Sequence, residues 1–273
     1  MKDIKTEKYW IRQQDNLEFM KEIESNSIDL IYSDILYGTG RNFKDYQDLK
    51  CDRKIIEEHY IPRIKEMHRI LKPTGTIYLQ MDTKINHWIR CIMDDIFGYN
   101  NFKNEIVWDY GGQSIKTDIS NKHDLILRYT KSNKYTYNTQ YKPHTERSKK
   151  EYRHLVDGKM CARTKRGDKF YYSPLNEEGT NITSVWSDIG LLTPSSKERK
   201  TVDYATQKPK ELLERIIKAS SNEGDTVADF YMGSGTTGDV ALELGRKFIG
   251  CDIGDKAFEI SSNRLKITLD KYL

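Results

Sequence analysis

The sequence lacks several features that would place it in other protein classes. Its 273 residues contain no apolar run long enough to cross a membrane, which excludes a transmembrane helix. The opening stretch MKDIKTEKYWIRQQD has no apolar core of the signal-peptide kind, so we expect a cytoplasmic protein. The four cysteines lie far apart without a CxxC pair, and the six histidines show no ligand spacing. The sequence therefore predicts no metal site and no disulfide framework.

Positive charge is concentrated in one segment of the chain. Residues 141–172 contain ten Lys or Arg against four Asp or Glu, a net charge of +6, whereas the whole chain has a net charge of +4. Aromatic side chains interleave with these basic residues at Tyr141, Tyr152, Phe170, Tyr171 and Tyr172. This mixture is typical of surfaces that neutralise phosphates and pack against bases, although a solvated, lysine-rich loop has the same composition.

Two blocks of alternating strands and helices flank the basic segment. In the first block we expect strands at 28–33, 76–81, 104–108 and 125–129, and helices at 53–71 and 84–97. In the second block we expect helices at 208–220, 236–244 and 255–269, and strands at 226–230 and 247–251. Such alternation predicts an α/β fold with a mostly parallel sheet and helices on both faces. Residues 131–203 are expected to form an insert of mixed or β character.

The stretch DFYMGSGTTGDVALELG, which begins at Asp229, reads as a strand, a glycine turn and a helix. Glycines let the backbone approach a ligand, and a helix N-terminus offers free N–H groups. Asp252 ends the next strand about 20 residues later, where an acid accepts hydrogen bonds from ribose hydroxyls. No third glycine and no GKT or GKS follows, so S-adenosylmethionine fits better than a dinucleotide or a nucleoside triphosphate. A turn that serves only packing is the alternative.

The stretch YSDILYGTG places Asp34 and Tyr37 just beyond the strand that ends at Ser33. In an open parallel sheet, ligands bind beyond the carboxyl ends of the strands. If the strand that ends at Asp229 is the neighbour of the strand that ends at Ser33, the two loops face one cleft.

Three stretches resemble the amino-methyltransferases of DNA, which methylate adenine N6 or cytosine N4. VADFYMGSGTTGDVALELGRKFIGCDI is similar to their cofactor motif, YATQKPKELLERIIKASSNEGDTVADF to the helix before it, and SIDLIYSDILYGTG to their catalytic loop. NEIVWDYGG and LKPTGTIYLQMD are similar to intervening motifs of the β group, in which the catalytic motif precedes the cofactor motif. The resemblance does not extend to residues 131–200.

This resemblance implies a Rossmann-like, S-adenosylmethionine-dependent methyltransferase fold. It implies a catalytic half at 1–130, a target-recognition region at 131–203 and a cofactor-binding half at 204–273. The implied function is site-specific methylation of a flipped base in double-stranded DNA, in a bacterial or phage-like, nucleoid-associated setting. The acid at the first position of the loop favours adenine N6 over cytosine N4. A homodimer and a cognate restriction nuclease are partners that the resemblance leaves open.

Methylation at cytosine C5 is a poor fit to the sequence. That chemistry needs a cysteine nucleophile, usually after proline, whereas the four cysteines here follow lysine, arginine, methionine and glycine.

The resemblance assigns the chemistry to the Asp-Ile-Leu-Tyr loop. Asp34 and the Ile35 carbonyl are expected to accept the two N–H groups of the target amine, and Tyr37 to stack on the flipped base for roughly 1–3 kcal/mol. The usual loop is Asp-Pro-Pro-Tyr, so Ile35 and Leu36 replace two prolines that fix φ and stiffen the chain. A catalytically silent partner subunit that binds DNA or cofactor is therefore an alternative function, and RNA is a further alternative substrate.

The remaining candidate residues bind cofactor or DNA. Those expected to bind the cofactor are Asp15, Lys208, Asp229, Tyr231, Gly233, Ser234, Gly235, Thr236 and Asp252. Asp15 resembles the acid that contacts the cofactor's adenine amine, and its alternative role is to cap a helix. Lys208 is expected to pair with the methionine carboxylate or to be a solvated lysine. Tyr231 is expected to line the cofactor pocket or to pack in the core. Those expected to contact DNA are Arg41 and Lys44 after the catalytic loop, and Lys149, Lys150, Lys165 and Arg166 in the basic segment.

Overall fold

The computed structural model describes residues 2–41, 47–112, 115–193, 195–202, 204 and 206–272. The chain forms two compact units, of which the larger contains Met1–Asn138 and Ser184–Leu273 and the smaller contains Thr139–Thr183. Each unit has a sheet of its own.

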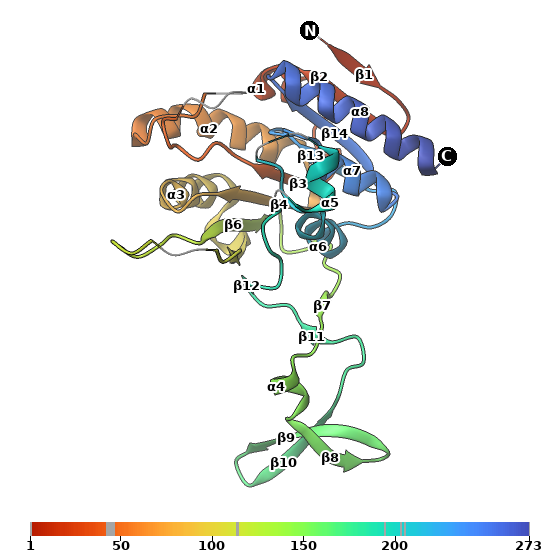
Figure 1. The fold of residues 1–273 in the computed structure, drawn as a ribbon. Coiled ribbons are helices and arrows are strands. Elements are labelled where there is room, and N and C mark those ends of the chain that lie inside the picture. Colours follow the sequence, from red (N-terminus) through yellow and green to blue (C-terminus); the bar gives the residue numbers. More distant parts are fainter. Residues whose placement is uncertain are drawn as a thin grey trace. The chain divides into compact units, whose positions relative to one another are not determined.

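A nine-stranded sheet forms the centre of the larger unit, in the order β1-β2-β14-β13-β3-β4-β6-β5-β12 (Figure 1). Its strands are β1 (Asp3–Lys5), β2 (Tyr9–Gln13), β3 (Ile28–Asp34), β4 (Leu71–Met81), β5 (Phe102–Asp109), β6 (His123–Thr130), β12 (Val185–Trp186), β13 (Thr226–Asp229) and β14 (Lys247–Asp252). The ladders from β2 to β4 and between β5 and β12 are parallel, whereas β6 pairs antiparallel with β4 and β5, and β1 with β2. The mostly parallel sheet predicted from the sequence is confirmed.

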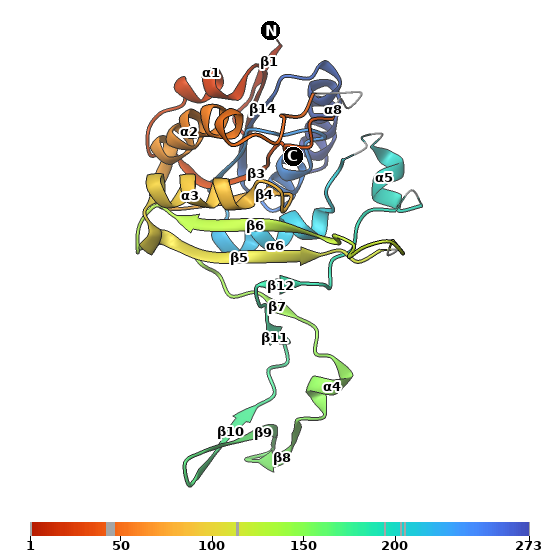
Figure 2. The same ribbon diagram turned by 90° about the vertical axis from the view of Figure 1, so that its left-hand side faces the viewer.

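Two groups of helices cover the two faces of this sheet (Figures 1 and 2). The helices and the short 3₁₀ turn of the larger unit are α1 (Asn16–Lys21), α2 (Arg53–Ile70), α3 (Asn86–Phe97), η1 (Tyr99–Asn101), α5 (Lys197–Thr201), α6 (Lys210–Ser220), α7 (Thr236–Glu243) and α8 (Asp255–Tyr272). The first three pack against one another on one face, and α6, α7 and α8 do so on the other. None of the helices in the described part of the chain is long and apolar enough to span a membrane.

Burial patterns explain the elements nearest the site. In α2, Ile56, Tyr60, Ile64 and Met67 recur at helical spacing and are all buried, so one face of the helix packs on the core. In β3, nearly every residue is buried because helices cover both faces of the sheet. The strand is therefore a nearly continuous apolar run and does not alternate between apolar and polar residues.

The N-terminal elements and the start of β4 differ from the sequence-based expectation. β1 and β2 were not expected, yet β2 pairs in parallel with β14 along five residues, Tyr9 to Gln13, and so extends the sheet. The helix α2 ends at Ile70, and β4 begins at Leu71 without a connecting loop, so the Lys-Pro-Thr-Gly stretch lies inside the strand.

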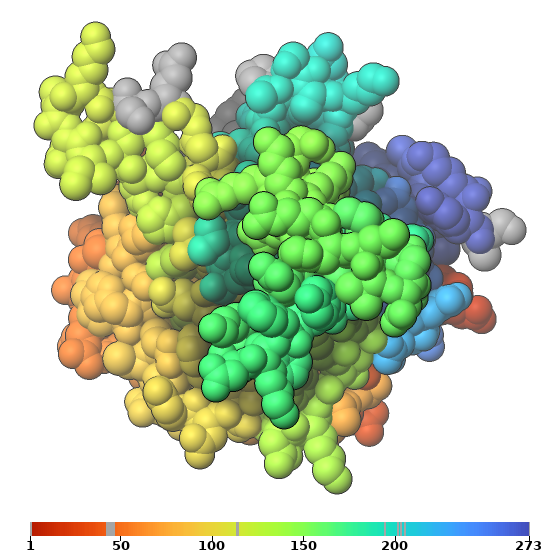
Figure 3. Space-filling model, turned by 90° about the horizontal axis from the view of Figure 1, so that it is seen from below, coloured from red at the N-terminus to blue at the C-terminus, as the bar shows by residue number. Residues whose placement is uncertain are grey.

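The smaller unit is built from short antiparallel strands. Its three-stranded sheet has the order β10-β9-β8, and a second ladder joins β7 and β11. Its elements are β7 (Tyr141–Lys142), α4 (Glu146–Lys149), β8 (Tyr152–Val156), β9 (Lys159–Arg166), β10 (Lys169–Pro174) and β11 (Thr180–Asn181). The atoms of this unit are green in Figure 3. This unit is shorter than the expected insert at 131–203, because 131–138 and 184–202 belong to the larger unit, where β12 extends the large sheet.

Candidate active site

The Asp-Ile-Leu-Tyr loop at 34–37, which we call the catalytic loop, and the glycine turn at 233–235 follow neighbouring strands. β3 and β13 pair in parallel, with Leu30 opposite Val227 and Ile31 opposite Ala228, so both loops start at the same edge of the sheet. The expected arrangement of these two strands is thereby confirmed. A cavity of about 390 Å³ lies between the loops, entirely within the larger unit.

Most of the residues singled out in the sequence line this cavity. They are Asp15, Asp34, Ile35, Leu36, Tyr37, Arg41, Lys208, Asp229, Tyr231, Gly233, Ser234, Thr236 and Asp252. Gly235 is not among the lining residues, although it is the N-cap of α7 and directly follows and precedes residues that are. Lys44 lies outside the described residues.

The glycine turn requires its glycines. Gly233 and Gly235 have φ of +50° and +72°, a region that side chains with a Cβ rarely adopt. A Cβ on Gly235 would also lie 2.8 Å from Oγ of Ser261 on α8. The Gly233 N–H donates to Oδ2 of Asp252 at 2.9 Å, which joins the turn to the end of β14. Burial raises the pKa of Asp252, and the backbone N–H groups that it accepts oppose the rise.

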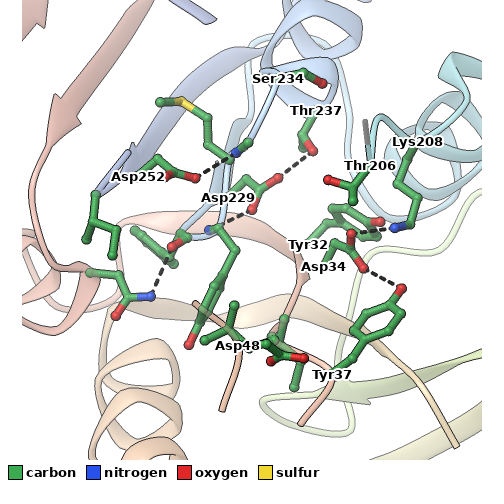
Figure 4. A pocket seen from close by; sticks show the side chains of 18 of the residues that line it. Tyr32, Asp34, Tyr37, Asp48, Thr206, Lys208, Asp229, Ser234, Thr237 and Asp252 are labelled. Atoms are coloured by element: carbon green, nitrogen blue, oxygen red, sulfur yellow. Dashed lines mark hydrogen bonds and ion pairs between the residues drawn. The ribbon is translucent and has the colours of Figure 1, made fainter. Parts of the chain in front are cut away.

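Asp229 is a buried acid at the end of β13. Its carboxylate accepts hydrogen bonds from Oγ1 of Thr237 at 2.6 Å and from the Tyr231 N–H at 3.0 Å (Figure 4). Burial raises the pKa of Asp229 to about 7, because removal from water disfavours the charged form.

Both oxygens of Asp34 have partners within the chain (Figure 4). Nζ of Lys208 donates to Oδ2 at 2.5 Å, and the Tyr37 hydroxyl lies 2.8 Å from Oδ1. Burial raises the pKa of Asp34, and the Lys208 ammonium opposes that rise. Lys208 precedes α6, which starts at Lys210, and its ammonium forms an ion pair with Asp34.

A second acid, Asp124, approaches the same tyrosine and was missed in the sequence. Its Oδ2 lies 2.7 Å from the Tyr37 hydroxyl and accepts Nε2 of Gln80 at 2.8 Å. Oε1 of Gln80 in turn accepts the Tyr32 hydroxyl at 2.7 Å. The hydroxyl of Tyr110 lies 3.5 Å from the other oxygen of Asp124. Asp124 stands near the start of β6, far from the catalytic loop in sequence, so no local pattern indicated it.

The two aliphatic residues of the loop are fixed by the fold. The Ile35 N–H donates to the Gln80 carbonyl at 3.0 Å, and the Ile35 side chain is only 2% exposed in the main core. The Leu36 carbonyl accepts the Tyr60 hydroxyl at 3.0 Å. Within the described chain, the Ile35 carbonyl has no hydrogen-bond donor, so it can accept one from a ligand.

Asp48 accepts hydrogen bonds from the residues that follow the catalytic loop. No pattern in the sequence indicated this role. Its buried carboxylate accepts the N–H groups of Gly38 at 3.1 Å, Thr39 at 2.7 Å and Leu49 at 2.8 Å. Arg41, whose carbonyl accepts the Asp48 N–H at 3.0 Å, is exposed.

Asp15 and Tyr231, which line the cavity, have partners on α2. Asp15 caps α1 by accepting the Leu17 N–H at 2.9 Å, and it also pairs with Nη2 of Arg63 at 2.6 Å. The helix-cap interpretation of Asp15 is therefore confirmed, and its side chain still lines the cavity. The Tyr231 hydroxyl lies 3.3 Å from Nε2 of His59, whose pKa burial lowers to about 4.

The basic candidates of the smaller unit are exposed. Lys149 ends α4, and Lys165 and Arg166 lie on β9, where the Arg166 guanidinium stands 5.7 Å from the ring centre of Tyr171. Arg163 lies 4.6 Å from the ring centre of Phe170 in the same sheet. Lys150 follows α4 and is likewise exposed. The unit therefore presents cations paired with exposed aromatic rings.

Known proteins resemble this chain along nearly its whole length. A family model described as DNA methylase matches residues 28–263. The chain is 35% identical over 251 residues to the type II methyltransferase M.HpaI of Haemophilus parainfluenzae, covering 91% of this chain and 71% of that protein. It is 32% identical over 261 residues to the DNA adenine methyltransferase YhdJ of Escherichia coli (strain K12), covering 93% and 81%.

The fold is also similar to solved structures. The PvuII DNA methyltransferase (cytosine-N4-specific) has a TM-score of 0.66 at 15% identity, with 98% of this chain and 92% of that one covered. The M1.HpyAVI–SAM complex has a TM-score of 0.58 at 20% identity, with coverage of 94% and 98%. With the family match, these similarities show that this protein belongs to the DNA methylases of the N6 and N4 amino-methyltransferase family and has their Rossmann-like fold.

Proposed function

We propose that this DNA methyltransferase transfers a methyl group from S-adenosylmethionine to adenine N6 of a base flipped out of double-stranded DNA. The observation that supports it best is that Asp34 and the glycine turn line the same cavity. A methyl donor bound at the turn and an amine bound at Asp34 would share that cavity.

The cofactor side of the cavity fits S-adenosylmethionine, which supplies an electrophilic methyl group on a sulfonium. Asp252 retains lone pairs for ribose hydroxyls beyond the two backbone N–H groups that it accepts. The first N–H groups of α7, next to Gly235, are available to an aminoacyl carboxylate. The buried carboxylate of Asp229 offers an acceptor for an ammonium group.

On the opposite side, the catalytic loop fits a planar base that carries an amine. Asp34 and the Ile35 carbonyl accept its two N–H groups, which orients the amine and raises the electron density on nitrogen. Bound S-adenosylmethionine would supply the methyl group from its sulfonium, and Asp34 would accept the proton that the amine loses. The Lys208 ammonium opposes the rise in the pKa of Asp34 that burial causes, and the Tyr37 ring stacks on the base.

Adenine is the target that the sequence favours. The loop begins with an acid, and YhdJ, which is named a DNA adenine methyltransferase, is 32% identical over 93% of this chain. Cytosine N4 is the second candidate, because the same two acceptors would fit its exocyclic amine. Mass spectrometry of nucleosides from DNA methylated by the pure protein distinguishes the two products.

We propose the smaller unit as the region that recognises the target. Its exposed cations and rings suit a DNA surface, with contacts to Lys149, Lys150, Lys165 and Arg166, while Arg41 and Lys44 are proposed phosphate contacts. A homodimer and a cognate restriction nuclease are the proposed further partners. Light scattering of the free protein tests the first, and the genes beside this one test the second.

A catalytically silent partner subunit is the competing function. Two observations favour it: both oxygens of Asp34 are engaged within the chain, and Ile35 and Leu36 stand where prolines are usual. A transfer assay with radiolabelled cofactor and mixed duplex DNA separates the two functions.

The enzyme function requires label in DNA, a loss of at least about a hundredfold in Asp34→Ala, and retained cofactor binding by that variant. Asp95→Ala, at an exposed acid on α3, is the matched control and should transfer at the wild-type rate. Binding of cofactor and DNA by the wild type without any transfer would establish the silent partner instead.

A further inference from the structure

The Tyr37 hydroxyl lies between two carboxylates. It stands 2.8 Å from Oδ1 of Asp34 and 2.7 Å from Oδ2 of Asp124. A tyrosine hydroxyl carries one hydrogen, so it can donate to only one of these oxygens at a time. The structure therefore offers this hydrogen two alternative acceptors, one inside the cavity and one behind it.

Of the two oxygens of Asp34, only Oδ1 is readily released to a substrate. Oδ2 is paired with the Lys208 ammonium at 2.5 Å, and both side chains are largely buried. Breaking a buried ion pair leaves an uncompensated charge, which costs more than moving the hydrogen bond of a neutral hydroxyl that has a second carboxylate within reach. An incoming amine then has Oδ1 as its acceptor, which is the oxygen that Tyr37 contacts. Oδ1 has two lone pairs, but the amine has the full acceptor strength of this oxygen only when the Tyr37 hydroxyl donates to Asp124.

Asp124 is placed to take the hydrogen that Tyr37 gives up. It is only 6% exposed and is not among the described residues that line the cavity. Its Oδ2 is held by Nε2 of Gln80, and Gln80 is held by the Tyr32 hydroxyl. A fixed acceptor at 2.7 Å lets the hydroxyl change partner without becoming an unpaired buried group and without moving the ring.

We propose that Asp124 is a positioning residue that receives the Tyr37 hydrogen bond when the target amine occupies Asp34. This inference rests on the proposed methyl transfer and adds a residue to it. Asp124 touches neither substrate nor cofactor: it keeps the Tyr37 ring at the wall of the base pocket while Oδ1 of Asp34 changes from the tyrosine to the amine.

A double-mutant cycle between Tyr37 and Asp124 tests this exchange. In Asp124→Ala the hydroxyl has only Asp34 as acceptor and competes with the amine, so the single-turnover methylation rate should fall about ten- to hundredfold with cofactor Kd unchanged. In the Tyr37→Phe background there is no hydroxyl to accommodate, so the same substitution should change the rate by less than about twofold. The lost Gln80 contact is common to both backgrounds and cancels in the cycle.

Two further variants serve as controls. Asp124→Asn retains a carbonyl oxygen that accepts from both Tyr37 and Gln80, so it should stay within about threefold of the wild-type rate. Tyr110→Phe removes only the 3.5 Å contact to the other oxygen of Asp124 and should leave the rate unchanged. Thermal unfolding of each variant shows whether it is folded at the assay temperature. Asp124→Asn keeps the cycle measurable if Asp124→Ala is not folded.

The outcomes separate this inference from the proposed function. An equal loss from Asp124→Ala with and without the Tyr37 hydroxyl would overturn the exchange while leaving the enzyme intact. A large loss in Asp124→Asn that persists in Tyr37→Phe would overturn it as well, because Asp124 would then act independently of the tyrosine. Absence of methyl transfer by the wild type would overturn the proposed function, and this inference with it.

Discussion

Restoring the usual first proline, by Ile35→Pro, should destabilise this protein. Proline has no N–H, and the Ile35 N–H donates to the Gln80 carbonyl at 3.0 Å, where β3 and β4 run side by side. The Ile35 side chain is also 2% exposed and packs in the main core. The aliphatic residue therefore contributes a hydrogen bond and packing that proline cannot supply.

The expected loss follows from three contributions. A buried carbonyl left without its donor costs about 1–3 kcal/mol. Proline buries about one carbon fewer than isoleucine, which costs about 0.8 kcal/mol. The stiffer unfolded chain returns about 0.4–1 kcal/mol. The free energy of unfolding should thus fall by about 1–3 kcal/mol, because the lost hydrogen bond outweighs the gain from stiffness.

Urea unfolding followed by circular dichroism measures this difference, with Ile35→Val as the matched control. Valine keeps the N–H and removes one methylene, so it should cost only about 0.5–1.5 kcal/mol. Methylation by Ile35→Pro, assayed well below its melting temperature, then reports on the loop alone. If Ile35→Pro were as stable as the wild type, the role assigned to the Ile35 N–H would be wrong.

Three further outcomes are expected from the site and the basic unit. Burial raises the pKa of Asp229 from its usual value near 4 to about 7. The contribution of Asp229 to the free energy of unfolding is therefore complete below about pH 4 and is lost as the pH rises through 7, by up to about 1.4 kcal/mol per pH unit. The difference in unfolding free energy between wild type and Asp229→Asn, measured from pH 4 to 8, should show this decline; a flat difference would contradict it. Gly235→Ala, with φ of +72° and Ser261 2.8 Å from the added Cβ, should distort the glycine turn and weaken cofactor binding at least about tenfold in calorimetry, and unchanged affinity would show that cofactor binding does not depend on the conformation of the turn. Replacing Lys165 and Arg166 by glutamine should weaken DNA binding and reduce the slope of log K against log salt by about 2, whereas an unchanged slope would show that neither contacts phosphate.

The parts of the site that the sequence predicted are those with local signals. The apolar run of β3 ends at Asp34 and the strand β13 ends at Asp229, so both acids could be placed at the carboxyl edge of a sheet before their pairing was known. The glycine turn followed from its residue types, and its positive φ values show why glycine stands there.

The missed parts depend on contacts between distant segments. Asp124 reaches the catalytic loop only because β6 pairs antiparallel with β4, a register that no pattern near Asp124 reveals. The partner of Lys208 could not be inferred either, since a lysine before a helix has many acceptors within reach. β12 is two residues long, too short for a periodic signal, so the end of the basic insert was placed too late in the chain.

The contacts of Asp48 have a consequence for how this site can vary. The Gly40 N–H donates to the Leu49 carbonyl at 2.7 Å and the Asp48 N–H to the Arg41 carbonyl at 3.0 Å, which closes the two ends of the intervening segment onto each other. Doubling the length of a closed loop adds only about 0.6 kcal/mol of closure entropy. A segment of another length or composition can therefore be inserted between Arg41 and Asp48 while the acid and tyrosine of the catalytic loop keep their positions, so contacts made by that segment can change independently of the chemistry.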